Sequence, residues 1–554
     1  MTILQSQIIN HLKEIIMNKF IILFSGMMLI ASSLVTAKAT NSNPLSDVRV
    51  RHAIAYAIDM ETIKDTLLEG KALVADAHIP NGPYKPAGLE NYAYNPNKAR
   101  RLLREANWDS SIELDMVYYY GDQLTVDLMT AIQAYLADVG VKMNFRRLEG
   151  DVGAQLWTGA SDPSGPAVVK WDLAYGAHGP LALQEYYSRY ETGGISIAPS
   201  PADKKLDQMI GVITGTPDVQ KQKEGFFNIA KYMQDQLYTY PLYYQQAFIY
   251  ESDRVNRNGG MYGNPQYNYD WGITNWTTTP DANGKMIMRT NTGPIEFFEH
   301  PWFNPALFIA NKVLFDRLIT CDGGLAPTRP KMAKHYSLSA DGMTLTFIMK
   351  ENLKWHDGSP LTADDVKWSI ETALKVPNLM PNFKTTFSSL KGAENFLNGS
   401  ASGISGISIN GNVLKLNFAK VDPNVLLSFS QFAPLPKKHL KNTDPVKLQQ
   451  DPYWQKPIGS GPYRVKEVQM NDYLVMVPYD DYHEGRARID EIIASPSNDN
   501  DANLIKNASA KRMDYGFTKN VADVKSLENM NHMNVLPQNI PYTRLIWFQK
   551  FRKK

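Results

Sequence analysis

Residues 44–70, PLSDVRVRHAIAYAIDMETIKDTLLEG, carry the pattern of two short helices in succession. Asp47 stands at the N-cap of the first helix, where apolar residues recur at helical spacing and Arg51 is expected to face solvent. Asp59 is the N-cap of the second helix, and Gly70 ends it as a left-handed C-cap. The stretch predicts a paired helical element ahead of the rest of the fold.

The composition is that of an ordinary soluble globular protein. Its 554 residues are enough for two or three domains, and a formal net charge of +2 gives no polyanion-binding signature, so we expect no nucleic-acid partner. Cys321 is the single cysteine, which excludes an intramolecular disulfide and a multi-cysteine metal site. The 29 tyrosines and 10 tryptophans fit a protein that holds ligands by stacking, although most such rings belong to cores.

Residues 1–39 have the pattern of a start extension followed by a signal peptide. Lys19 precedes an apolar run over 20–35, and Ala37 and Ala39 form an A-x-A cleavage site. The apolar run is too short for a membrane span, and no lipobox cysteine follows it. We expect cleavage after Ala39 and a periplasmic protein.

The first half of the mature chain has an α/β pattern. A helix over 94–108 is followed by a strand, helix and strand over 112–148, which predicts a β-α-β unit. The apolar strand 171–175 leads into a Gly/Pro loop over 176–180, and such strand exits are where α/β sheets place ligand groups. A further strand over 240–250 is expected to return the chain to the other lobe.

The second half carries sharper local signals. Residues 338–350 predict a hairpin with an Asp-Gly turn, and Thr362 with Asp365 predicts the N-cap and first turn of a helix. Residues 457–465, PIGSGPYRV, predict a glycine turn before a strand, and 542–549, YTRLIWFQ, an apolar strand. This half therefore combines strands and helices with a glycine turn between them.

Three segments resemble one family. They are DVRVRHAIAYAID over 47–59, WHDGSPLTADDV over 355–366 and PIGSGPY over 457–463. They are similar to motifs of the peptide/nickel class (family 5) of extracytoplasmic solute-binding proteins, the receptors of ABC importers. In that family the segment found here at 47–59 opens the second lobe and follows the other two. The halves of this chain therefore stand in exchanged order.

The resemblance implies an α/β, two-lobed periplasmic-binding-protein fold (class II type) with an extra inserted subdomain, circularly permuted. Joining Gln549 to Pro44 restores the family order, and the linker 277–285 closes the old ends. A chain cut at one crossing between lobes keeps one covalent crossing, near 248–254, which loosens closure. A chimeric or frameshifted reading frame is the alternative. The implied parts are the second ligand-binding lobe over 44–249, the first lobe over 250–316 plus 457–549, the inserted subdomain over 317–456, and a basic tail over 550–554.

The resemblance also implies a function. We expect a monomeric, non-enzymatic receptor that captures a peptide or peptide-like solute and delivers it to ABC permease subunits. Peptide-binding members carry an aspartate for the peptide amino group at the place of Leu181. Because no carboxylate stands there, a receptor for an oligosaccharide, an opine or a nickel chelate is an alternative, and so is a secreted hydrolase or a non-functional remnant.

Candidate ligand contacts come from strand ends and from segments matching the family's ligand loops. For each one, core packing is the competing interpretation. His178 has no second His or Cys at ligand spacing, so we expect no metal site and no cofactor, and His356 next to Asp357 is interpreted as a turn. The candidates are Tyr119, Tyr120, Tyr175, His178, Trp302, Phe303 and Phe387.

Overall fold

The computed structural model describes most of the chain. It covers residues 43–550 apart from 83, 161–165, 180–186, 188–189, 193–201, 261–270, 293–299, 303–308, 322–326, 378, 470–471 and 497–501. The fold is mixed α/β, and its main sheet has eleven strands in the order β15-β16-β17-β8-β18-β5-β19-β4-β2-β3, with β1 paired to β5.

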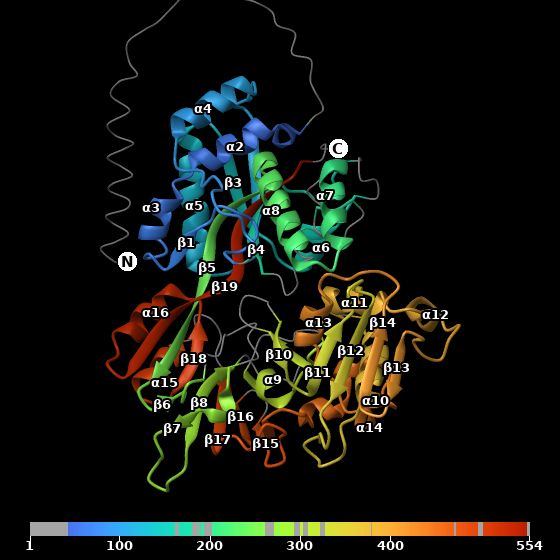
Figure 1. Cartoon of the computed structure of the whole chain (residues 1–554). Helices are drawn as coiled ribbons and strands as arrows, with labels where there is room; N and C mark the ends of the chain where they lie inside the picture. Colours follow the sequence, from blue (N-terminus) through green and yellow to red (C-terminus); the bar gives the residue numbers. More distant parts are fainter. Residues whose placement is uncertain are drawn as a thin grey trace, which may run out of the picture. The chain divides into compact units, whose positions relative to one another are not determined.

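The segment predicted as the second lobe contains helices on one end of this sheet (Figure 1). The predicted β-α-β unit is confirmed, because β2 and β3 are parallel and α5 lies between them in the chain. Its elements are η1 (Pro44–Ser46), α2 (Val48–Ala57), α3 (Met60–Thr66), β1 (Ala72–Val74), α4 (Pro96–Glu105), β2 (Glu113–Tyr118), α5 (Gln123–Asp138), β3 (Lys142–Arg147), α6 (Val152–Trp157), β4 (Leu173–His178), α7 (Lys204–Thr214), α8 (Val219–Gln236) and β5 (Thr239–Ser252).

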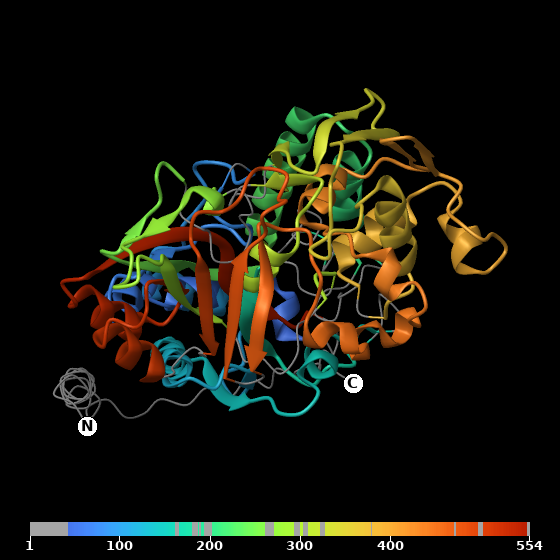
Figure 2. The ribbon, with the colours of Figure 1, turned by 90° about the horizontal axis from the view of Figure 1, so that it is seen from below.

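The other end of the sheet is built from both the middle and the last part of the chain. Strands β15, β16 and β17 lie side by side there (Figure 2), and β17 pairs in parallel with β8. The elements are β6 (Val255–Asn256), η3 (Ile273–Asn275), β7 (Thr277–Thr278), β8 (Ile287–Thr292), α9 (Ile309–Leu314), β15 (Tyr463–Gln469), β16 (Tyr473–Pro478), β17 (Glu491–Pro496), α15 (Ala502–Ser509), β18 (Tyr515–Thr518), α16 (Val521–Glu528) and β19 (Met533–Phe548).

The segment predicted as the inserted subdomain has its own sheet, in the order β11-β12-β14-β13. The predicted hairpin is confirmed as β11 and β12, with Gly342 at φ +70° in the turn. The elements are β9 (Ile319–Cys321), β10 (Pro327–Pro330), β11 (Ala333–Leu338), β12 (Thr344–Met349), α10 (Ala363–Ala373), α11 (Pro381–Ser388), α12 (Ala393–Leu397), β13 (Ile407–Asn410), β14 (Val413–Asn417), α13 (Val425–Gln431), α14 (Lys437–Leu440), η4 (Pro445–Gln450) and η5 (Pro452–Gln455).

The two helices expected in 44–70 are present as α2 and α3. Asp47 accepts a hydrogen bond from the amide of Arg49, as predicted for an N-cap. The predicted C-cap is misplaced, because α3 ends at Thr66 with Leu67 as its C-cap, and Gly70, which has φ +71°, lies three residues beyond Leu67. The expectation that Arg51 faces solvent is wrong, because its side chain is buried. Its guanidinium donates to the carbonyls of Leu45 and Leu237, beside the C-terminal end of α8. Carbonyls at that end have no partner within the helix, so a cation is stabilised there.

The WHDG segment forms a turn, as interpreted from the sequence. His356 accepts from the amide of Gly459 at Nδ1 (3.0 Å) and donates from Nε2 to the carbonyl of Gly461 (2.9 Å). These two bonds fix the neutral imidazole as a structural bridge to the glycine turn, and burial lowers its pKa to about 4. The N-cap of α10 is also confirmed, with a capping box between Thr362 and Asp365.

Strands β5 and β19 connect the two ends of the main sheet (Figure 1). They pair in antiparallel register from Met533 with Ser252 to Trp547 with Thr239. Beyond its pairing with β5, the last part of β19 also pairs with β4. The expectation of one covalent crossing is therefore wrong: both strands run between the two ends of the sheet, and β19 ends beside β4, in the part of the sheet built by residues 44–249.

Both ends of the described chain meet beside α2. The side-chain amide of Asn43 donates to the carbonyl of Gln549 at 2.6 Å, across 506 positions of sequence. The amide of Gln549 in turn donates to the carbonyl of Asp172 (2.8 Å), and the Lys550 ammonium donates to the carbonyl of Tyr238 (3.2 Å). The end of β19 is thus anchored where the first helices begin.

Candidate functional site

Tyrosines gather where β2 and β4 end. Tyr119 and Tyr120 directly follow β2, and their hydroxyl oxygens are 2.8 Å apart. Tyr175 lies in β4 with its ring centroid 5.9 Å from that of Tyr120, and its hydroxyl is 3.2 Å from that of Tyr243 on β5. Three of the four residues predicted at these strand ends therefore meet in one aromatic cluster, which we call the tyrosine cluster (Tyr119, Tyr120, Tyr175 and Tyr243).

The tyrosine hydroxyls are neutral donors and acceptors. Burial raises the pKa values of Tyr120 and Tyr175 well above the usual range of a phenol. Both phenols keep their protons at every physiological pH as a result. Tyr175 is almost fully buried, whereas Tyr119 and Tyr120 are partly exposed. Tyr119 and Tyr120 are therefore the partly accessible pair of the tyrosine cluster.

Arg544 of β19 packs on this cluster. Its guanidinium carbon lies 4.0 Å from the ring centroid of Tyr120 and 5.8 Å from that of Tyr175. Its Nε donates to the side-chain oxygen of Gln245 on β5, at 2.8 Å. Side chains alternate along a strand, so Arg544 shares a face with Ile546 and Phe548, which belong to one hydrophobic core cluster. A cation at the edge of an apolar face completes the cluster.

The exit of β4 differs from the expectation. The strand runs on to His178, so the predicted loop 176–180 begins only at Gly179. Gly176 is required inside the strand because a Cβ there would lie 2.6 Å from the Trp547 ring. His178 is buried in the strand opposite Thr543 of β19. Leu181 lies outside the described residues.

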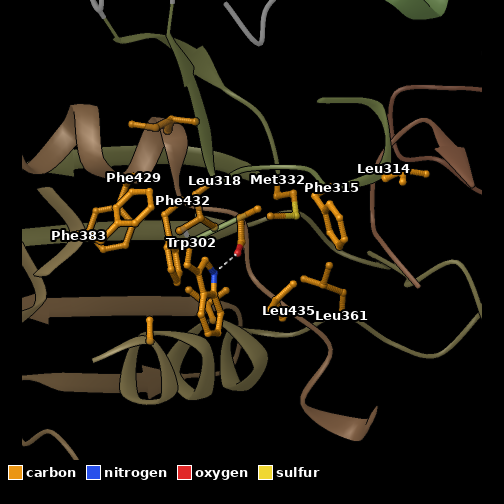
Figure 3. Close-up of a cluster of buried hydrophobic side chains, with 14 of the residues drawn as sticks. Trp302, Leu314, Phe315, Leu318, Met332, Leu361, Phe383, Phe429, Phe432 and Leu435 are labelled. Carbon is orange, nitrogen blue, oxygen red and sulfur yellow. Dashed lines mark hydrogen bonds between the residues drawn. The ribbon is translucent and has the colours of Figure 1, made fainter. Parts of the chain in front are cut away.

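Of the remaining sequence candidates, Trp302 and Phe387 do not join the tyrosine cluster. Trp302 is fully buried, stacks on Phe432 and donates from Nε1 to the carbonyl of Ala433 at 2.8 Å (Figure 3). Phe387 is fully buried in the same core, 4.8 Å from Phe432 between ring centroids. Phe303 lies outside the described residues. Trp302 and Phe387 therefore fit the competing interpretation, which is core packing. Ligand contact by Trp302, Phe303 or Phe387 stays a prediction.

The sequence reasoning missed Arg544, Gln245 and Tyr243. A signal for Arg544 was present, because a lone arginine interrupts the apolar strand YTRLIWFQ. Buried strands read as continuous apolar runs, so a charge inside one marks a special position. Tyr243 and Gln245 gave no signal, because only the register of β5 against β19 brings them to the site.

Two features are absent from the described residues. Within them, no three His, Cys, Asp or Glu side chains gather in a way that could hold a metal ion. No helix in the same part of the chain is both long and apolar enough to cross a membrane.

The family model of bacterial extracellular solute-binding proteins, family 5, middle, matches residues 27–192 and 328–550, more than half of the chain. The chain belongs to this family. Family 5 membership agrees with the resemblance of the three sequence motifs, and it places the protein among substrate-binding proteins that act outside the cytoplasm.

Individual relatives match shorter stretches. A putative ABC transporter peptide-binding protein of Brucella ovis is 36% identical over 100 residues, 18% of this chain and 19% of the relative. The oligopeptide-binding protein OppA of Lactococcus lactis is 24% identical over 224 residues, 39% of this chain and 37% of that protein. The crystal structure of NikZ from Campylobacter jejuni in complex with Ni(L-His) has a TM-score of 0.35 and 23% identity, covering 45% of each chain. The chain thus spans less than half the length of each family 5 protein that it matches here.

Proposed function

We propose that the chain is a receptor that captures a peptide or peptide-like solute outside the cytoplasm and delivers it to the permease of an ABC importer. Family 5 membership supports this class of function, and the names of the Brucella and Lactococcus relatives favour peptides.

We further propose that residues 1–39 direct export and are removed. Intact-mass measurement of the exported protein checks this, and a first residue other than Thr40 contradicts it.

The observation that carries the proposal is the tyrosine cluster beside the two crossing strands. Aromatic faces and neutral hydroxyls from β2, β4 and β5 converge at one place, where stacking and hydrogen bonding to a peptide-like solute are both available. We assign ligand contact to Tyr119 and Tyr120, and support of those two residues to Tyr175 and His178. A binding role needs no converging acid and base, unlike the alternative of a secreted hydrolase.

A thermal-unfolding screen of the mature protein tests this function. A pool of short peptides should stabilise the protein by about 2.7 kcal/mol when a ligand is present at about a hundred times its dissociation constant. The variant Tyr120→Phe, which removes one hydroxyl of the cluster, should bind several-fold more weakly. Its matched control is Tyr94→Phe, because Tyr94 is 41% exposed and lies just before α4, outside the cluster.

The screen separates the alternatives. Stabilisation by oligosaccharides, opines or nickel chelates alone would replace the peptide assignment with that of another solute. A cooperative melt with no response to any of these classes would overturn the receptor function and favour the non-functional remnant.

We also propose that the chain is a circular permutant of the family order. The bond between Asn43 and Gln549 supports it, because the end of β19 lies beside the segment that follows it in the family order. The predicted closure of the old ends falls on an exposed turn, where Asp281 accepts from the amides of Asn283 and Lys285 and Gly284 has φ +76°. Exposed turns tolerate new chain ends.

A reordered gene tests the permutation. It begins at residue 284, runs to 549, continues directly into residue 44 and ends at 283. This protein should fold with the same circular dichroism spectrum and a free energy of unfolding within about 1 kcal/mol of the original, because only a turn is opened. A matched reordering that opens the chain inside β5, between 245 and 246, should not fold. If neither reordered chain folds, the permutation proposal fails and the chimeric reading frame is favoured.

A further inference from the structure

Arg544 is a cation without an anionic partner among the described residues. Its Nε donates to the neutral side chain of Gln245, and its Nη1 is buried with no hydrogen-bond partner in that part of the chain. No carboxylate of the described residues forms an ion pair with it. Arginines with buried donor groups usually pair with a carboxylate or phosphate in a two-pronged geometry, so this donor set is incomplete.

The surroundings of Arg544 are aromatic and neutral. The rings of Tyr120, Tyr175 and Tyr542 lie 4.0, 5.8 and 5.5 Å from the guanidinium carbon. The face of an aromatic ring stabilises a cation while leaving the N–H groups at its edge free to donate. The rings therefore hold the guanidinium in place and remove part of its hydration without using its donors.

The carboxylate of Asp122, an acid near Tyr175, already accepts hydrogen bonds from another residue. Asp122, which acts on Tyr175 electrostatically, caps helix α5 and accepts from the amide (2.9 Å) and the hydroxyl (3.1 Å) of Thr125. The second nearby cation, Lys519, lies 5.1 Å from the Tyr542 ring and adds positive charge to the same side. Arg544 and Lys519 thus both lie against the Tyr542 ring, and two cations on one side of the tyrosine cluster favour an anion there.

The site is also reachable. Arg544, Tyr120 and Tyr542 are all partly exposed, although the Nη1 atom itself is covered. Strand pairing sets Arg544 opposite Tyr243 of β5 and Ala177 of β4, beside the ends of β2 and β4 that carry the proposed ligand contacts. A solute bound at the tyrosine cluster would bring its polar groups to this guanidinium.

We propose that Arg544 binds a carboxylate of the solute and that the natural ligand is an acid, with its carboxylate held by the guanidinium and its body against Tyr119 and Tyr120. This inference rests on the proposed receptor function and deepens it by naming the charge of the ligand. At the position where the resemblance implies an amine-binding aspartate, this chain has Leu181. The receptor thus selects the acidic end of its solute rather than the amino end.

Paired probes test the inference on the unmodified protein. One pool contains di- to tetrapeptides with free carboxyl termini and its twin contains the same peptides as C-terminal amides. A second pair contains uronic-acid oligosaccharides and their neutral counterparts. Titration calorimetry should show binding of an acid pool about 10- to 100-fold tighter than binding of its neutral twin.

Variants assign the discrimination to one side chain. Arg544→Gln should reduce acid binding by about 10- to 100-fold and leave the weak binding of the neutral twin unchanged, whereas Arg544→Lys should keep part of the preference. The control is Arg146→Gln, because Arg146 is exposed on β3 and pairs with Asp115 at 2.9 Å. Equal binding of acid and neutral twins by the unmodified protein would overturn the role of Arg544 while the receptor function stands. Binding of neither twin in either pair would overturn both proposals, and this outcome does not depend on whether the variants fold.

Discussion

Replacing Asp514 with asparagine should lower the free energy of unfolding by about 3–5 kcal/mol, the range for removing one partner of a buried ion pair. The Asp514 side chain is 1% exposed and forms ion pairs with Arg254 (2.9 Å) and Arg289 (3.5 Å). It also accepts from the amide of Arg289 at 2.8 Å and from the hydroxyl of Ser252 at 3.2 Å. Asp514 directly precedes β18, and its carboxylate thus connects the end of β5 to the strand β8.

Asparagine keeps the size of the side chain and removes the charge. The amide nitrogen of asparagine would face an arginine or a backbone amide, both of which are donors, so at least one former bond becomes a clash between donors. Urea unfolding followed by circular dichroism measures the loss. The matched control is Asp115→Asn, whose exposed pair with Arg146 should contribute less than about 1 kcal/mol. Equal losses in the two variants would contradict the role assigned to Asp514.

Gly459→Ala should cost roughly 3 kcal/mol or more, because there is no room for a methyl group at this turn. A Cβ at position 459 would overlap the carbonyl oxygen of Leu314 and lie 3.1 Å from the His356 ring. That carbonyl already accepts from the amides of Ser460 and Gly461, both at 2.9 Å, so it cannot move without breaking two bonds. Overpacking against backbone is relieved only by shifting a whole segment.

The control for this variant is a glycine that no neighbouring side chain crowds. Gly211 lies inside α7, and no atom lies within 4 Å of the place that an added methyl group would occupy. Gly211→Ala should therefore leave the protein unchanged or stabilise it by up to about 1 kcal/mol. The same urea titration compares the two alanine variants. Similar stability of both would show that the turn can relax and that the close approach is not required.

Helix ends could be predicted from the sequence where a residue type has one common structural role. The N-caps Asp47, Asp59 and Thr362 were predicted and found, because a short oxygen side chain before a helix has few other uses. The solvent-facing placement of Arg51 failed for the opposite reason. One of its partners is the carbonyl of Leu237, 186 positions away in the chain at the end of α8, and helical spacing carries no information about it.

The candidate site was predictable only in part. Strand ends pointed to Tyr119, Tyr120 and Tyr175, since side chains at neighbouring strand ends of an α/β sheet meet at one edge. Aromatic identity alone did not separate these residues from Trp302, which lies in a core (Figure 3), or from Phe387, which is fully buried in the same core. Large apolar rings satisfy packing and ligand binding equally well, so only position in the fold distinguishes them.

The pairing of β5 with β19 is interrupted between Asn539 and Thr543, whereas the ladder is regular on the N-terminal side. A hydrogen-bonded ribbon resists bending, so a rotation of one end of the sheet against the other costs least at this gap. Arg544 lies one residue beyond it. A carboxylate held by Arg544 would move little during such a rotation, whereas residues further from the gap would move more. A single anchor at Arg544 would therefore serve solutes of several lengths.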